Sequence, residues 1–218
     1  MPQKQALTLM VLTYPSRLMF KFMIVSLEQV TIGDDCIAIG RGSSYINITG
    51  VQCGPGHGIS IGSLGAQGRT DTVEEVHVQG CSFRGTTNGA RIKTWQGGSG
   101  YARRISFEDI TLDAVDNPII IDQYYCINNE NGCKIKTSAV QVSDVLYNGV
   151  HGTSITEEAV KINCSQSIAC TNLVFNDINI TSAYPGETTR SVIFNAEGTS
   201  APSVPALNYL SPPKPRRV

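Results

Sequence analysis

The stretch VHVQGCSFRGTTNGARIK, residues 76–93, decides the fold. It contains three pairs of apolar residues two positions apart: Val76/Val78, Cys81/Phe83 and Ala90/Ile92. A spacing of two, interrupted by glycine and asparagine, is typical of short strands with one buried face. The stretch therefore predicts three strands joined by tight turns.

The same order of apolar pairs recurs along the chain. The first pairs of successive units are Ile46/Ile48, Val76/Val78, Ile105/Phe107, Val140/Val142 and Leu173/Phe175, and their starts lie 30, 29, 35 and 33 residues apart. The last pairs are Ile59/Ile61, Ala90/Ile92, Ile119/Ile121 and Val160/Ile162, followed by Ile193. Several strands in each unit of about 30 residues indicate an all-β solenoid, in which each unit is one coil of a parallel β-helix. A β-sandwich is the alternative, but it does not explain the matching order of the strands.

Composition limits the function classes. The 218 residues carry a net charge of −1, so no global field favours nucleic acid or an anionic membrane. Twenty-one glycines and only 7% aromatic residues suit a turn-rich β protein. The apolar runs within residues 1–29 are shorter than a membrane span, and no clear signal-peptide cleavage pattern follows them.

Cysteines and glycosylation sequons favour an oxidising, secreted location. Three cysteine pairs are close enough in sequence for short-loop disulfides: Cys36/Cys53, Cys126/Cys133 and Cys164/Cys170. Cys81 is left over, and its strand pattern predicts a buried free thiol. Candidate acceptors for N-linked glycans are Asn47, Asn163 and Asn179.

Polar residues gather around the last strand of successive units. Their positions are Asp34 and Asp35, then His57, then Arg91 and Lys93, then Asp122, Tyr124 and Tyr125. Matching positions of successive coils become spatial neighbours, so these side chains should share one surface strip. Paired carboxylates suit glycoside hydrolysis, and Arg and Lys suit binding of sugar carboxylates. The strip therefore predicts hydrolysis of an acidic sugar polymer.

Four segments carry a family resemblance over about residues 30–185. They are GDDCIAIG (33–40), CGPGHGISIGSLG (53–65), NGARIKTWQGGSG (88–100) and NPIIIDQYYC (117–126). In this order they resemble the plant polygalacturonases of glycoside hydrolase family 28. The resemblance implies a right-handed parallel β-helix that hydrolyses α-1,4-galacturonan (pectate or de-esterified pectin) with inversion, without metal or cofactor. It also implies a secreted, monomeric cell-wall protein, with polygalacturonase-inhibiting proteins as candidate partners.

The resemblance assigns roles to particular residues. Asp34 resembles the general acid, Asp35 a carboxylate that activates water, and His57 the imidazole beside the acid. Arg91 and Lys93 resemble the binders of the substrate carboxylate, and Tyr125 resembles the tyrosine that shapes the substrate subsite. Cys36/Cys53 resembles the disulfide that ties the acid-bearing turn to the histidine coil.

One expected motif is missing. The family carries an Asn-Thr-Asp motif one coil before its Gly-Asp-Asp, yet no such tripeptide occurs here, and no Asp or Glu lies between Met1 and Leu27. The sequence is therefore expected to be an N-terminally truncated or divergent member with weak or no activity. Two alternatives stay open: a non-catalytic pectin-binding paralogue or pollen allergen, and a calcium-dependent pectate lyase.

The domain boundaries follow from these patterns. Residues 1–29 are predicted to form an atypical N-terminal segment with partial coils, and residues 30–200 the β-helix domain of catalytic type. Residues 201–218 are predicted to form a Pro-rich C-terminal tail.

Overall fold

The computed structural model describes residues 9–10, 35–127 and 133–213. Its strands form two parallel sheets. Sheet A contains β1 (Leu9–Met10), β2 (Ile37–Ile39), β5 (Ile59–Leu64), β8 (Asn88–Trp95), β10 (Asn117–Tyr125), β12 (Glu158–Asn163) and β14 (Arg190–Phe194), paired in this order. Sheet B contains β3 (Ser44–Thr49), β6 (Thr70–Gln79), β9 (Ser99–Val115), β11 (Gln141–Ser154), β13 (Cys170–Ser182) and β15 (Ala196–Ser200). The short strands β4 (Gln52–Cys53) and β7 (Ser82–Arg84) pair with each other, and β7 also pairs with β9.

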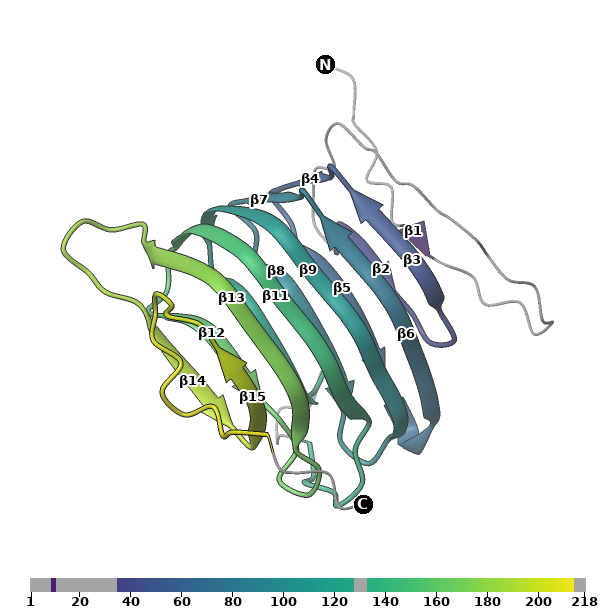
Figure 1. Ribbon diagram of the computed structural model, residues 1–218. Coiled ribbons are helices and arrows are strands. Elements are labelled where there is room, and N and C mark those ends of the chain that lie inside the picture. The colour runs from purple at the N-terminus through teal and green to yellow at the C-terminus, as the bar shows by residue number, and fades with distance from the viewer. Residues whose placement is uncertain (1–8, 11–34, 128–132, 214–218) are drawn as a thin grey trace.

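The chain alternates between the two sheets, so each passage through both completes one coil. Figure 1 shows the strands of sheet B lying side by side in chain order, from the N-terminal to the C-terminal end. Side chains that face each other across neighbouring strands are commonly 29 residues apart, as for His77 and Ser106. The predicted parallel β-helix with coils of about 30 residues is therefore confirmed.

Aliphatic columns fill the interior, as the period-2 pattern predicts. In sheet A, Ile59 pairs with Ala90, Ala90 with Ile119, and Ile119 with Val160, and all four are fully buried. In sheet B the rings of Phe107, Tyr147 and Phe175 stack, with centroids 5.4 and 5.1 Å apart. Neighbouring strands of a sheet lie about 4.8 Å apart, so each inward side chain packs on its equivalents in the next coils.

One predicted equivalence is wrong. Val145 and Tyr147, not Val140 and Val142, pair with Ile105 and Phe107. The coil between them holds the loop closed by the Cys126–Cys133 disulfide, which makes it longer than the others. The pattern of apolar residues alone does not reveal where such a loop ends.

Single residues turn the long strands at the coil corners. Between paired positions of sheet B, Tyr45, Glu75, Arg104, Asp144 and Asn172 all have positive φ, from 53° to 58°. This left-handed conformation is unfavourable for most L-residues. Because the same bend recurs in every coil, the strands on both sides of it stay in register.

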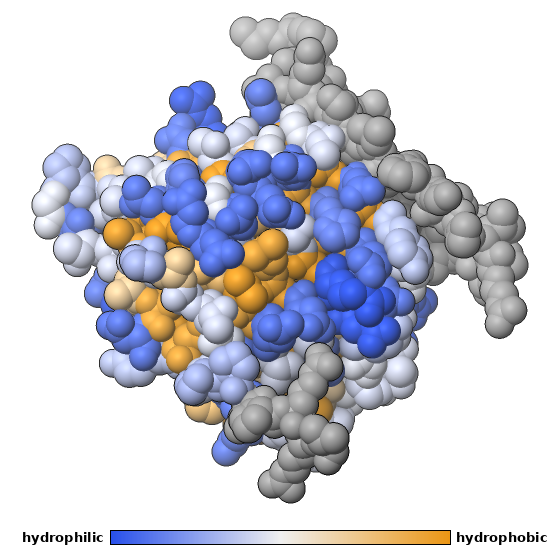
Figure 2. Space-filling model, viewed as in Figure 1, coloured by the Kyte–Doolittle hydropathy of each residue, from blue (hydrophilic) through white to orange (hydrophobic). Residues whose placement is uncertain are grey.

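The outside of the solenoid and its C-terminal end differ from the interior. Figure 2 shows apolar atoms over β11 and β13, where the half-buried Leu146 and Val174 are paired, with hydrophilic residues around them.

Residues 201–213 continue along the last coil, with Leu207 buried against the core. Within the described part of the chain no helix is long and apolar enough to cross a membrane.

Candidate active site

The outer face of sheet A carries the predicted site. Ser60 pairs with Arg91, Arg91 with Ile120, and Ile120 with Lys161. The next outward row pairs Lys93 with Asp122 and Asp122 with Asn163. Their neighbours along each strand are buried in the core, so alternation directs these side chains outward. We call these seven residues the outer strip.

Asp35 forms a buried ion pair at the N-terminal side of the outer strip. Its carboxylate accepts hydrogen bonds from Lys93 Nζ at 2.6 Å and from Ser60 Oγ at 2.7 Å. The side chains of Lys93 and Asp35 are only 9% and 7% exposed. Three coils therefore meet at one carboxylate, which is fixed in orientation.

Asp34, the predicted general acid, lies outside the described residues, as does Gly33 before it. The adjacent Cys36 donates its N–H to Gly58 O at 2.7 Å. The backbone directly after Asp35 is thus attached to the histidine coil.

His57 occupies the position equivalent to Asp35 on the next coil. Ile37 pairs with Ile59, and each follows its polar residue by two positions. Asn88 Nδ2 donates to the backbone oxygen of His57 at 3.3 Å. Gly58 has φ +76°, and a Cβ there would lie 2.0 Å from Asn88 O, so only glycine fits this close approach.

Two cations flank the ring of Tyr125. Arg91 Cζ lies 5.2 Å and Lys93 Nζ 5.5 Å from the ring centroid, and Trp95 meets the same ring edge-on at 5.4 Å. A register shift between Asp122 and Tyr125 brings Tyr125 opposite Trp95. The arrangement combines cation–π attraction with an aromatic surface suited to a sugar ring.

Arg91 and Trp95 also present unsatisfied donors. Among the described residues, Arg91 Nε and Trp95 Nε1 are buried and have no hydrogen-bond partner. Buried donors are normally paired, so these two are exceptions, and both belong to side chains that contact the Tyr125 ring.

Asp122 adds a second carboxylate to the outer strip. Burial raises its pKa, whereas the Tyr124 N–H and the charge of Arg91 act in the opposite direction. Its Oδ1 accepts the Tyr124 N–H at 2.9 Å.

The sequence of the chain matches the model of a known protein family. The model for glycosyl hydrolases family 28 matches residues 21–201 of the chain. The chain belongs to glycosyl hydrolase family 28.

Relatives of known name place the chain among the plant members of family 28. A probable polygalacturonase of Arabidopsis thaliana is 53% identical over 184 residues, which are 83% of this chain and 40% of the relative. Polygalacturonases of Malus domestica and Cryptomeria japonica are 49% and 45% identical over 156 and 194 residues, covering 72% and 88% of this chain. The chain spans only 34% and 37% of the length of these two relatives.

A solved structure supports the fold of this family 28 chain. The crystal structure of endo-xylogalacturonan hydrolase from Aspergillus tubingensis superposes with a TM-score of 0.66 at 22% identity. The match covers 79% of this chain and 48% of the fungal enzyme. At this identity the similarity concerns the fold alone.

The cysteines of the family 28 chain pair as their spacing predicts. The disulfides are Cys36–Cys53, Cys126–Cys133 and Cys164–Cys170, and Cys81 is a buried free thiol. Of the sequon asparagines, Asn163 and Asn179 are exposed and Asn47 is half-buried.

Sequence reasoning missed Ser60 and Trp95. Ser60 follows the inward Ile59, so strand alternation alone would place it beside Arg91 on the outer strip. Trp95 lies two residues after Lys93 on β8, so strand alternation predicts that its side chain points to the same side of the sheet. A serine or a tryptophan on a strand does not by itself indicate catalysis or binding.

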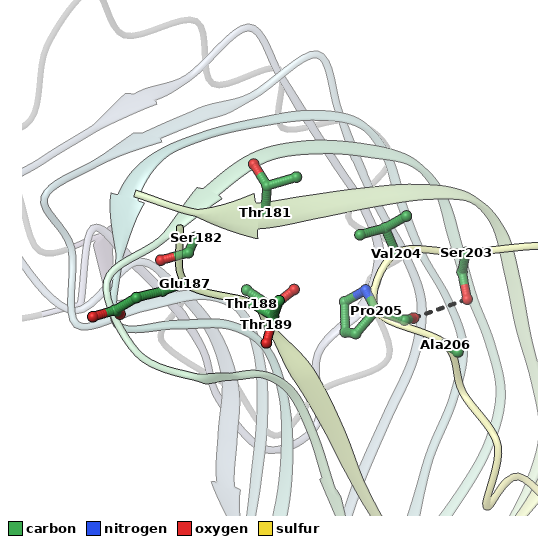
Figure 3. Close-up of a pocket in the computed structure, with 9 residues that line it drawn as sticks. All are labelled: Thr181, Ser182, Glu187, Thr188, Thr189, Ser203, Val204, Pro205 and Ala206. Carbon is green, nitrogen blue, oxygen red and sulfur yellow. Dashed lines mark hydrogen bonds between the residues drawn. The ribbon is translucent and has the colours of Figure 1, made fainter. Parts of the chain in front are cut away.

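A separate cavity of about 330 Å³ lies at the C-terminal end of sheet B, and none of its lining residues belongs to the outer strip (Figure 3). Its lining includes Thr181, Thr189 and Ser203. Thr189 donates its hydroxyl to Ile180 O at 2.7 Å and Ser203 donates to Pro205 O at 3.0 Å. These hydroxyls already serve the fold, so the cavity offers few groups for chemistry.

Proposed function

We propose that this family 28 chain acts on polygalacturonate, hydrolysing α-1,4-galacturonosyl bonds with inversion. The observation that carries the proposal is the convergence of Asp35, Lys93, Arg91 and Tyr125 on one face of sheet A. A carboxylate beside cations and an aromatic ring matches the needs of a bond between anionic sugars.

In this proposal Asp34 donates a proton to the glycosidic oxygen as the bond from that oxygen to the anomeric carbon breaks. Asp35 takes a proton from a water molecule, whose oxygen attacks the anomeric carbon from the opposite face. Ser60 and Lys93 hold the Asp35 carboxylate in place. His57, on the neighbouring coil, supports the acid.

Substrate binding in this proposal depends on Arg91, Lys93 and Tyr125. The guanidinium of Arg91 is half-buried over the Tyr125 ring and supplies positive charge for a sugar carboxylate. An ammonium has three N–H donors, so Lys93 can retain its hydrogen bond to Asp35 and still donate another to the substrate. The Tyr125 ring lies against both cations and limits where a sugar ring can rest.

A second candidate is binding of pectin without turnover. The observation that favours it is the absence of any Asp or Glu between Met1 and Leu27, where the family's further aspartate is expected. The same outer strip would then bind polygalacturonate, but activation of water would be weak. A location outside the cell, at the wall, follows in either case from the substrate.

The test measures binding and turnover together. The disulfide-bonded chain is incubated with polygalacturonate, bound polymer is quantified, and new reducing ends are assayed while NMR follows the anomeric configuration. Binding with release of inverted product supports hydrolysis, and binding alone supports the second candidate. Absence of both contradicts the proposal. Asp34→Asn should abolish turnover and leave the melting temperature unchanged; retained turnover would remove Asp34 as the acid.

A further inference from the structure

The sign of charge changes along the outer strip. On β8 the outward side chains are the cations Arg91 and Lys93, whereas Asp122 occupies the paired position on β10. A polymer lying across the strands meets a new coil about every 4.8 Å. Consecutive sugar units would therefore face opposite charges.

Asp122 is held in place with its carboxylate outward. Its neighbours Ile121 and Gln123 are fully buried, so alternation points Asp122 away from the core. Its Oδ1 accepts the Tyr124 N–H at 2.9 Å, which fixes the side chain. In register it lies between Lys93 on β8 and Asn163 on β12.

The cations near Asp122 form their closest contacts with other residues. Lys93 Nζ bonds Asp35 at 2.6 Å, and Lys161 Nζ bonds Glu158 at 3.1 Å. Arg91 attracts Asp122 but its guanidinium lies over the Tyr125 ring. Among the described residues Asp122 forms no ion pair, so a ligand over β10 would meet a half-buried carboxylate that no cation contacts directly.

We propose that the position over β10 selects a sugar unit whose carboxyl group is esterified, while the position over β8 takes a free carboxylate. This inference rests on the proposed function and names the pattern of substrate that the same site prefers. A free sugar carboxylate over β10 would meet the like charge of Asp122 at short range, whereas a methyl ester carries no charge.

The experiment compares two probes and two variants. The probes are galacturonan oligomers of equal length, one fully de-esterified and one methyl-esterified on alternate units. Dissociation constants are measured by calorimetry with the unglycosylated chain at low ionic strength. Asp122→Asn removes the charge and keeps an oxygen that accepts the Tyr124 N–H. Asn163→Asp, at the exposed paired position, adds a charge of the same sign.

The two variants should shift selectivity in opposite directions. Asp122→Asn should tighten binding of the de-esterified oligomer by about fivefold to tenfold, as expected for removal of one short-range like-charge contact in a partly screened site. Binding of the alternately esterified oligomer should change less than twofold. Asn163→Asp should weaken the de-esterified oligomer selectively, and if Asp122→Asn fails to fold, Asp122→Ser removes the same charge and decides the question.

The control is Asp113→Asn. Asp113 lies on β9, where its exposed carboxylate pairs with Arg84, and its removal should leave the ratio of the two dissociation constants unchanged. Equal changes for both oligomers in the two outer-strip variants would overturn the inference and leave the proposed function standing. If neither oligomer binds the unaltered chain, the proposed function fails, and the inference fails with it.

Discussion

Two groups of ion pairs connect the coils on opposite sheets, and they differ mainly in exposure. On sheet A, Lys93 and Asp35 are 9% and 7% exposed. On sheet B, Glu74 pairs with Arg103 and Arg104, whose side chains are 37% and 43% exposed. Both groups join carboxylates to cations across coils, yet the second is far more exposed to water.

The difference in exposure means that an ion pair between coils affects stability differently on sheet A and on sheet B. Water screens the sheet B group, and exposed pairs contribute about 0–1 kcal/mol. The sheet A pair is largely buried, so removal of one partner takes an opposite charge away from a poorly solvated ion. The buried pair thus fixes the geometry of the candidate active site. The exposed group adds little to the stability of the solenoid.

The largest effect is expected for Lys93→Met. The substitution removes the cation that bonds the buried Asp35 carboxylate, and should lower the free energy of unfolding by about 3–5 kcal/mol. Urea denaturation at neutral pH measures the loss. A loss below about 1 kcal/mol would make the two groups equivalent and break the comparison.

Ser60→Ala should have the next largest effect. It removes one hydrogen bond to a charged group, worth about 1.5–3 kcal/mol, while Lys93 still compensates Asp35. The same denaturation experiment applies. Combined with Lys93→Met in a double-mutant cycle, the two losses should not add, because both residues act on one carboxylate.

Asp122 provides an intermediate case that depends on pH. Burial raises the pKa of its carboxyl group in the folded state, so folding favours the protonated form. Its contribution to stability is therefore fully present below the ordinary pKa of aspartate and is lost as pH rises through the folded-state pKa. Asp122→Asn should accordingly gain stability relative to the unaltered chain between acid and neutral pH. A difference that is constant across this range would contradict the assignment.

Arg103→Met should leave the urea denaturation midpoint close to that of the unaltered chain, because water screens an exposed ion pair. Glu74 keeps its second partner Arg104, and solvent hydrates the carboxylate. Part of any loss comes from the contact of Arg103 with the Tyr101 ring, whose centroid is 4.0 Å from Cζ. Arg103→Lys, which retains the charge, separates that contact from the ion pair.

The smallest expected effect is that of salt on these differences. At 1 M NaCl the Debye length is about 3 Å, so the loss caused by Arg103→Met should fall toward zero. The loss caused by Lys93→Met should persist, because salt screens a largely buried pair much less. Equal salt dependence in the two variants would show that the sheet A pair is hydrated in solution.

The sequence predicted the fold well because each coil repeats one simple constraint. Inward pairs such as Ile59/Ile61 and Ala90/Ile92 must stack, and their spacing of two residues reveals both the strand and its buried face. The equivalence of Val140 with Ile105 was wrong because a loop closed by a disulfide changes coil length without changing the apolar pattern.

The candidate site was predictable only in part. Alternation places Arg91 and Lys93 outside the core, and an outward lysine on a strand is usually hydrated. That Lys93 is buried depends on Asp35, 58 residues earlier, on the coil two strands away. Such a long-range partner leaves no local pattern, so the sequence gives the direction of the side chain but not its environment.

The left-handed corner residues have a stereochemical consequence. An L-residue in this conformation is disfavoured by roughly 1–2 kcal/mol, and its mirror image prefers it. In a chemically synthesised chain, D-amino acids at Asp144 or Asn172 should therefore be tolerated or stabilising, whereas a D-residue at Val145 or Leu173, one step along, should disrupt the stack. The turning of the coils thus takes place against the chirality of residues such as Asp144 and Asn172, separately from the aliphatic interior.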